Sequence, residues 1–185
     1  MQMATVLVES GAGGHGSGFF IADDLIMTNA HVVGFADTLR VTLSGKTDYD
    51  LARLVRTDRP RDIAILKLVE KPNPKLYRVA PISTQKTDIG ESVFVVGAPQ
   101  YKKLQDTVTS GIISGLRYDK KRRQTYIQSD ALIHGGNSGG PMFNDNGAVI
   151  GISVLGFINR DGHDLAGLNW FIPIGDALDK LNVQQ

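Results

Sequence analysis

Short apolar segments separated by turn signals constrain this chain more than any other feature of its sequence. They are rich in Val and Ile and are bounded by Gly, Asn, Asp or Pro. β-Branched residues in runs of this length favour strands, because a helix needs a longer amphipathic stretch to bury one face. The predicted strands lie at residues 6–8, 18–21, 25–28, 39–43, 63–68, 92–96, 107–109, 111–116, 124–128, 140–143, 148–153 and 168–172.

The turns between these segments predict how the strands are arranged. Residues 22–24 and 145–147 are typical of hairpin turns, and the second contains Asn-Gly, which tolerates positive φ. Many short strands at this spacing predict an all-β protein built from barrels or sandwiches. Two prolines within residues 71–74 interrupt the pattern between two series of strands. Only residues 175–182 predict a helix, a short one capped by Asp176.

The composition excludes several kinds of site. The chain has 185 residues and no cysteine, which rules out disulfides, zinc–thiolate sites and a cysteine nucleophile. Its formal net charge of +1 gives no reason to expect nucleic acid, and the basic run at residues 120–123 is interpreted as a solvated loop. Four histidines without clustered spacing predict no metal site. His15 and His163 lie in Gly- and Asp-rich segments and are expected to be solvated.

The sequence also argues against a cofactor and against membrane insertion. The glycine-rich residues 11–14 are not followed by a helical pattern, so a phosphate-binding loop is not predicted. No apolar run approaches the roughly 18 residues that are needed to span a bilayer. Residues 1–8 lack the basic and apolar regions of a signal peptide. A cytoplasmic location is therefore open, as is a mature form or an excised domain.

Ser138 stands in the glycine-dense segment GGNSGGP, residues 135–141. Such a segment can turn tightly, expose a hydroxyl and present backbone N–H groups beside it. A serine hydroxyl is a poor nucleophile unless a base lies within hydrogen-bond reach, and an imidazole held by a buried carboxylate is suited to that role. His31, in TNAHVV, and Asp62, ahead of the apolar run IAILKL, can supply these two groups.

Each of these three residues, taken alone, has an ordinary structural interpretation. A histidine between apolar segments is most often a hydrogen-bonded structural residue, and an aspartate before a strand is most often a turn or cap residue. A glycine-rich turn needs no catalytic role. Because separation along the sequence does not show that the three side chains meet, the catalytic interpretation depends on the motifs around them.

These motifs, taken together and in order, resemble the chymotrypsin-like serine peptidases and in particular the HtrA/Deg branch. The chain order His, Asp, Ser is the same. The similar motifs are GSGF at 16–19, TNAHVV at 28–33, DIAIL at 62–66, TVTSGIIS at 107–114, IQSDA at 127–131, GNSGG at 136–140 and WFIP at 170–173. The resemblance covers nearly the whole chain.

The resemblance implies two antiparallel six-stranded β-barrels with the active site between them, followed by a short C-terminal helix. The implied boundaries are residues 1–75 for the first barrel, 76–88 for the connector, 89–174 for the second barrel and 175–182 for the helix. The first barrel would supply His31 and Asp62, and the second would supply Ser138. The implied activity is that of a serine endopeptidase, which hydrolyses peptide bonds through an acyl-enzyme intermediate.

The residues beside the serine define the expected oxyanion hole, which is formed by Gly136, Asn137 and Ser138, with the N–H groups of Gly136 and Ser138 as donors. Digestive members of the chymotrypsin-like group have an aspartate in the place of Asn137. That aspartate pairs with the N-terminus that zymogen cleavage frees. Because an amide cannot form this ion pair, no zymogen step is expected.

The primary specificity pocket is expected to be apolar and of modest size. Leu132 stands where a trypsin-like pocket has an acid at its base, and burying Lys or Arg without a counter-charge is costly. The predicted preference is therefore for Val, Leu, Ile, Ala or Met at the cleavage site. The residues assigned to the pocket are Leu132, Ile133, His134, Ser153, Val154, Leu155 and Trp170.

Two other functions are open at this level. A peptide-binding or chaperone-like module would use the same cleft with gated or minor cleavage, although such a module has no need of all three residues. An esterase of unrelated fold is disfavoured, because the serine segment does not match the G-x-S-x-G elbow. The resemblance implies polypeptide substrates and a cell-envelope or periplasmic location, and it leaves the formation of homo-oligomers open.

Overall fold

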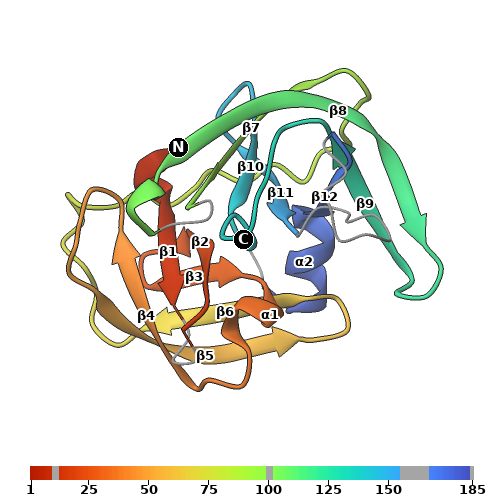
Figure 1. Cartoon of the computed structure of the whole chain (residues 1–185). Coiled ribbons are helices and arrows are strands. Elements are labelled where there is room, and N and C mark those ends of the chain that lie inside the picture. Colours follow the sequence, from red (N-terminus) through yellow and green to blue (C-terminus); the bar gives the residue numbers. More distant parts are fainter. Residues whose placement is uncertain (10–12, 99–101, 155–166, 184–185) are drawn as a thin grey trace.

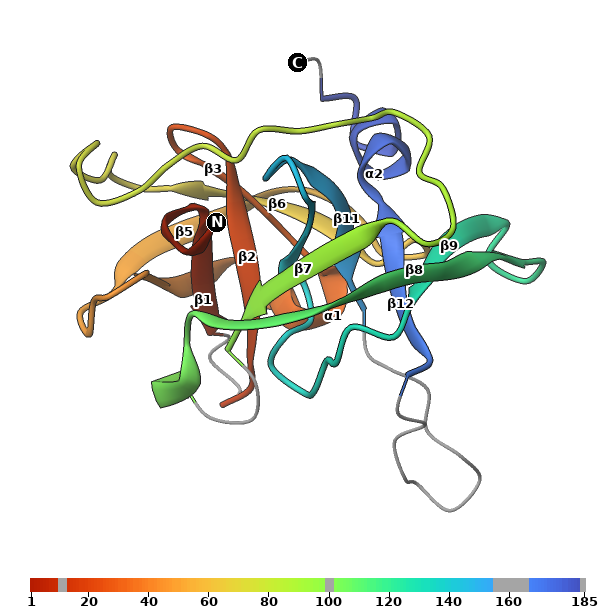
Figure 2. The same ribbon diagram turned by 90° about the horizontal axis from the view of Figure 1, so that it is seen from above.

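Twelve strands form two closed antiparallel barrels of six strands each within the residues that the structure describes (Figures 1 and 2). This arrangement confirms the predicted all-β fold class. The structure is a computed structural model, and it describes residues 1–9, 13–98, 102–154 and 167–183.

Both barrels join their strands in the same order. The first barrel runs β1-β2-β3-β6-β5-β4, and the second repeats this order as β7-β8-β9-β12-β11-β10. The strands of the first barrel are β1 (Thr5–Glu9), β2 (His15–Ala22), β3 (Leu25–Thr28), β4 (Thr38–Leu43), β5 (Asp50–Asp58) and β6 (Ile63–Leu68). Those of the second are β7 (Ser92–Gly97), β8 (Thr107–Asp119), β9 (Gln124–Ser129), β10 (Pro141–Asn144), β11 (Val149–Ser153) and β12 (Asn169–Pro173).

Short helices complete the described fold. They are the 3₁₀ turns η1 (Gln2–Ala4) and η2 (Lys102–Leu104) and the α-helices α1 (Ala30–Val33) and α2 (Ile174–Lys180). The structure places α2 where the sequence predicts a helix, but Asp176 does not cap it. Pro173 is the N-cap residue, with no side-chain cap bond, and Asp176 lies in the first turn. Burial, and then the neighbouring charge of Asp179, raise the pKa of Asp176.

The structure corrects the sequence prediction at two strands. β5 has no counterpart in the prediction, because charged residues recur along it and its apolar pattern is weak. It forms because both of its edges are paired, one with β4 and the other with β6. The predicted strands at residues 107–109 and 111–116 are one continuous strand, β8, in which the register shifts between Ile113 and Gly115.

β2 carries apolar side chains on both faces, because one face fills the first barrel and the other packs against the second barrel. Phe20 packs with Val6 and Ile26 in the core of the first barrel. Phe19 points the opposite way, because successive strand residues face opposite sides, and it belongs to a cluster that both barrels and α2 share. This seam cluster includes Met27, Ile63 and Ile65 from the first barrel, Phe143, Ile152 and Ile172 from the second, and Ala177 and Leu178 from α2.

The link between the barrels crosses one side of the molecule (Figure 2). β6 ends at Leu68 and β7 begins at Ser92, so residues 69–91 form this link. The predicted connector, residues 76–88, lies inside it. The link also binds both barrels, because the Ala80 N–H donates to the Phe20 carbonyl over 2.9 Å and the Ser83 N–H donates to the Val149 carbonyl over 3.0 Å. The candidate site lies where strand ends from both barrels approach each other.

Candidate active site

His31 lies on α1, a single helical turn that follows β3 almost directly. Asn29, the N-cap residue, has extended backbone angles and turns the chain out of the strand. Val32 and Val33 pack into the core of the first barrel, whereas the His31 side chain is 47% exposed. One helical turn has no periodic signal in a sequence, which is why this helix escapes prediction.

Asp62 closes the turn between β5 and β6 in a left-handed conformation, with φ of +61°. Its N–H donates to the carbonyl of Arg59 over 3.1 Å. Its own carbonyl accepts a bond of 2.8 Å from the Asn29 side chain. Left-handed backbone is unfavourable for most residues but is tolerated by Asp and Asn. Asn29 and Asp62 thereby tie the start of β6 to the end of β3.

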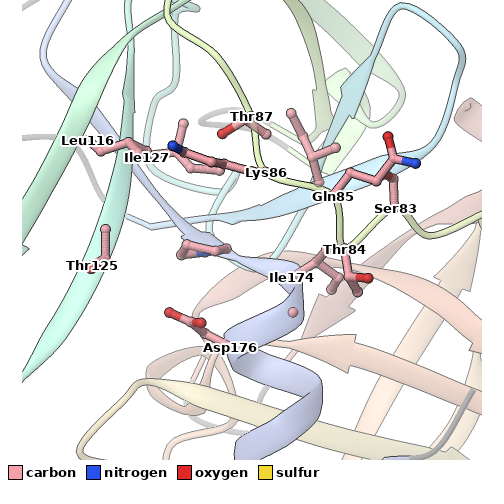
Figure 3. A pocket seen from close by; sticks show the side chains of 13 residues that line it. Ser83, Thr84, Gln85, Lys86, Thr87, Leu116, Thr125, Ile127, Ile174 and Asp176 are labelled. Carbon is pink, nitrogen blue, oxygen red and sulfur yellow. The ribbon is translucent and has the colours of Figure 1, made fainter.

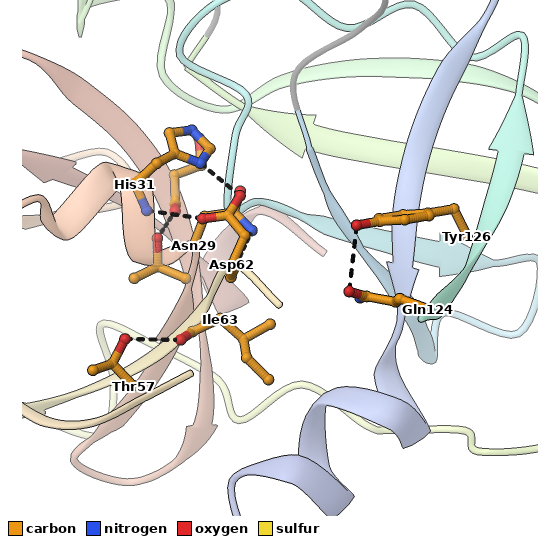
Figure 4. Close-up of polar contacts among 9 residues, drawn as sticks. Asn29, His31, Thr57, Asp62, Ile63, Gln124 and Tyr126 are labelled. Atoms are coloured by element: carbon orange, nitrogen blue, oxygen red, sulfur yellow. Dashed lines mark hydrogen bonds and ion pairs between the residues drawn. The ribbon is translucent and has the colours of Figure 1, made fainter. Parts of the chain in front are cut away.

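Two hydrogen bonds join His31 to the carboxylate of Asp62, one from its backbone and one from its ring (Figure 4). The backbone N–H of His31 donates to Oδ1 of Asp62 over 2.9 Å. Nδ1 of the His31 ring lies 2.7 Å from Oδ2. An ionised carboxylate only accepts hydrogen bonds, so Nδ1 carries the hydrogen. Nε2 of His31 is then left as an acceptor, the state that a general base requires.

Ser138 lies in a turn that precedes β10 and is held from both sides. Within the turn, the Asn137 N–H donates to the His134 carbonyl over 3.0 Å. The backbone of Ser153, at the end of β11, accepts from the Gly139 N–H over 2.9 Å and donates to the Gly140 carbonyl over 2.8 Å. The short turn that the glycine-dense segment predicts is therefore present and is anchored to the second barrel.

The same turn packs against the first barrel beside His31. The Ser17 N–H donates to the Ser138 carbonyl over 2.8 Å. A Cβ atom at Gly139, where φ is +84°, would overlap the Ser17 carbonyl and lie 2.9 Å from the Asn29 nitrogen. Only glycine fits this approach. Among the described residues, no hydrogen bond joins the Ser138 hydroxyl to His31, so contact between backbones is what brings the serine and histidine segments together.

Some backbone N–H groups around Ser138 donate hydrogen bonds within the protein, and others do not. The Asn137 N–H is engaged by His134, as described above. In the described part of the chain, neither the Gly136 N–H nor the Ser138 N–H donates a hydrogen bond. Gly136 has a left-handed φ of +99°. Two neighbouring free donors of this kind are suited to binding an oxyanion.

The three residues before Gly135 that were assigned to the pocket lie in different surroundings. Leu132 is 43% exposed, and its carbonyl accepts a bond of 2.7 Å from the Thr109 hydroxyl. Ile133 is buried within the core of the second barrel. His134 is half-buried.

The remaining assigned pocket residues lie at the end of β11, directly after it or on β12. Ser153 is fully buried, and its hydroxyl has no partner among the described residues. The Val154 N–H donates to the Trp170 carbonyl over 3.0 Å. The Trp170 ring stacks on Tyr126 with centroids 4.8 Å apart. Leu155 lies outside the described residues.

Tyr126 lies on β9 of the second barrel, apart from the His31–Asp62 pair (Figure 4). Its hydroxyl donates to Oε1 of Gln124 over 3.3 Å. Burial is the main cause that raises the pKa of Tyr126. The Arg122 guanidinium opposes this effect, whereas the charges of Asp119 and Asp62 act in the same direction as burial. The hydroxyl therefore stays protonated at neutral pH.

Two residues near Ser138 were missed or misjudged from the sequence. His15, expected to be solvated, is half-buried as the first residue of β2, and its Nε2 lies 3.0 Å from the Ala98 carbonyl oxygen. Ser17 is fully buried and bonded to the turn that carries Ser138. The GSGF motif contained the signal for Ser17, but only the packing of the two barrels gives that serine its partners.

A separate pocket of about 230 Å³ lies away from these residues, between the link, β8, β9 and the start of α2 (Figure 3). Its apolar lining includes Leu116, Ile127, Ile150 and Ile174. None of the residues predicted for the site lines it. Over the described ranges, no group of His, Asp and Glu side chains is arranged to hold a metal ion, and no helix is long and apolar enough to cross a membrane.

Comparisons with known proteins agree on one family. Residues 16–152 match the family described as "Trypsin-like peptidase domain". A protein named "Probable periplasmic serine endoprotease DegP-like", from Pseudomonas putida (strain W619), is 39% identical over 170 residues, which is 90% of this chain and 34% of the relative.

Two eukaryotic proteins are similar to a comparable degree. "Protease Do-like 1, chloroplastic" from Arabidopsis thaliana is 36% identical over 91% of this chain and 39% of its own length. "Serine protease HTRA1" from Xenopus laevis is 38% identical over 85% of this chain and 33% of its own length. The chain thus spans well under half the length of these relatives.

Proposed function

Because this chain belongs to the trypsin-like peptidase domain family, and the relatives named above are proteases, we propose that it is a serine endopeptidase. Ser138 is the nucleophile, His31 the general base and Asp62 the group that orients His31. Gly136 and Ser138 supply the oxyanion donors through their N–H groups, and Asn137 connects them. The substrates are polypeptides.

The reaction proceeds in two halves. Ser138 Oγ attacks the carbonyl carbon of the peptide bond while His31 Nε2 takes the hydroxyl proton, and the carbonyl oxygen becomes an oxyanion. When the C–N bond breaks, His31 gives this proton to the departing amine, leaving an ester on Ser138. Water then attacks the ester, His31 accepts a proton from that water, and the carboxylic acid product leaves as Ser138 regains its proton.

The observation that best supports this proposal is the doubly bonded pair of His31 and Asp62. One bond, from the His31 backbone, fixes where the carboxylate lies, and the other, from the ring, fixes the tautomer. With a side chain only 19% exposed, Asp62 is shielded from water, whereas the His31 ring is accessible to a substrate. A purely structural ion pair would not need an exposed ring.

Covalent labelling tests the proposal. A fluorophosphonate probe reacts with serines that an adjacent base activates, so we expect it to modify the native protein at Ser138, as located by mass spectrometry of the digested adduct. Heat-denatured protein, the control, should not react. If the native protein binds peptides but is not modified, the peptide-binding or chaperone-like alternative is correct instead.

The specificity of cleavage is a separate prediction. We propose that the residues assigned to the pocket accept Val, Leu, Ile, Ala or Met, because Leu132 leaves no carboxylate to pair with a buried cation. A peptide library digested by the native protein should be cut mainly after these residues, as read by mass spectrometry of the products. Cleavage mainly after Lys or Arg would contradict the apolar assignment without affecting the proposed catalytic residues.

A further inference from the structure

We propose that Ser17 is a positioning residue that holds the two oxyanion donors in place, an inference that rests on the proposed function of Ser138. Ser17 bonds to the carbonyl groups of both donor residues. Its hydroxyl donates to the Gly136 carbonyl over 2.8 Å. Its N–H donates to the Ser138 carbonyl over 2.8 Å. Ser17 lies on β2, which passes beside β7 in Figure 2, so the first barrel fixes a turn of the second.

The first bond acts on a peptide group that is held at both ends. The carbonyl of Gly136 and the N–H of Asn137 belong to the same planar peptide unit. Ser17 binds the carbonyl, and His134 accepts from the N–H over 3.0 Å. Rotation of this unit would break both bonds. Gly136 itself offers little resistance to rotation because it has no side chain.

The hydroxyl of Ser17 is oriented by a further donor. The Ala98 N–H donates to Ser17 Oγ over 3.1 Å, so the hydroxyl hydrogen is directed to the Gly136 carbonyl. The carbonyl of Ala98 is in turn bonded to His15 Nε2 at 3.0 Å. On the opposite side of Ser17, the Thr28 hydroxyl donates to its carbonyl over 2.7 Å. Every polar atom of Ser17 is therefore engaged.

The surroundings leave no substitute for the hydroxyl. Ser17 is 0% exposed. A Cβ atom at Gly97 would lie 3.0 Å from Ser17 Oγ, and one at Gly140 would lie 3.1 Å from Ser17 Cβ. Alanine in place of Ser17 would leave the Gly136 carbonyl and the Ala98 N–H buried without a partner. The peptide unit after Gly136 could then turn to find another partner, and the oxyanion donors would lose their fixed positions.

The test separates positioning from simple loss of stability. For Ser17→Ala we expect kcat to fall about tenfold or more with KM unchanged, because the lost interaction acts on the transition state. Affinity for a peptide aldehyde, which forms a hemiacetal oxyanion on Ser138, should fall by the same factor. Ser17→Cys keeps a donor at the same place, although the sulfur is larger and donates more weakly than the hydroxyl, so its kcat should fall between those of Ser17→Ala and the native protein. This variant also carries the test if Ser17→Ala does not fold.

Ser44→Ala is the matched control. It also removes a serine hydroxyl that bonds one barrel to the other, through Asp106 Oδ2 over 2.9 Å, but away from the site. Its kcat and its affinity for the aldehyde should match those of the native protein, even where its thermal unfolding midpoint is lower. Native-like kcat and aldehyde affinity in both Ser17 variants would overturn the inference. Failure of the native protein to form the hemiacetal would instead overturn the proposed function.

Discussion

Ser138→Ala is expected to lower kcat/KM for a peptide substrate by a factor on the order of 10⁴–10⁶, the loss typical of removing the nucleophile of such a triad. The residual rate would come from substrate binding and the free donors of Gly136 and Ser138. The measurement is initial-rate hydrolysis of a chromogenic peptide by protein purified away from other peptidases.

The fold should survive this substitution. The Ser138 hydroxyl makes no hydrogen bond in the described part of the chain, and the turn is held by backbone bonds that alanine retains. The thermal unfolding midpoint of Ser138→Ala should therefore match that of the native protein. Substantial peptidase activity in a correctly folded Ser138→Ala variant would exclude this residue as the nucleophile.

Asp62→Asn is expected to lower kcat by about 10⁴-fold, because the amide presents an N–H to the ring and selects the wrong tautomer of His31. This substitution suits the test better than alanine. Asp62 has φ of +61°, a conformation that asparagine also adopts readily, and the Asn29 bond reaches its backbone rather than its side chain. The change in activity can then be read with little change in backbone strain.

Asp58→Asn provides the comparison from the same turn. Asp58 pairs with Arg61 over 2.8 Å but does not contact His31, so its loss should leave kcat close to the native value. Both variants are compared by steady-state kinetics with one peptide substrate and by thermal unfolding. An Asp62→Asn protein that keeps native kcat would show that the pair with His31 has only a structural role.

The sequence predicts those parts of the fold that depend on neighbouring residues, such as apolar runs and turn dipeptides. Residues 63–66 are all apolar because one face of the strand fills the first barrel and the other fills the seam cluster, and such a run predicts a buried strand. The turn at Gly147, with φ of +75°, is similarly encoded by Asn-Gly. β5 escaped prediction because pairing with both neighbours, rather than its own composition, makes it a strand.

The candidate site likewise contains residues that the sequence predicts and contacts that it does not predict. His31, Asp62 and Ser138 could be proposed from residue type and motif. The partners of Ser17 and His15 could not, because Gly136 is 119 positions from Ser17 and Ala98 is 83 positions from His15 along the chain. Such contacts exist only after the barrels pack together. Sequence patterns indicate which residues are candidates for catalysis, whereas the packing of the barrels determines which residues position them.

The seam between the barrels also has a consequence during synthesis. A nascent chain that has emerged from the ribosome only as far as β6 contains His31 and Asp62 but lacks Ser138, the proposed nucleophile. The turn of Ser138 is anchored by Ser153 on β11, and the second barrel closes only when β12 pairs with β9 and β11. Completion of the site therefore waits until nearly all of these 185 residues have been made. Under the proposed function, a chain assembled in this order does not yet hold His31, Asp62 and Ser138 together while its later strands are unpaired and easily cut.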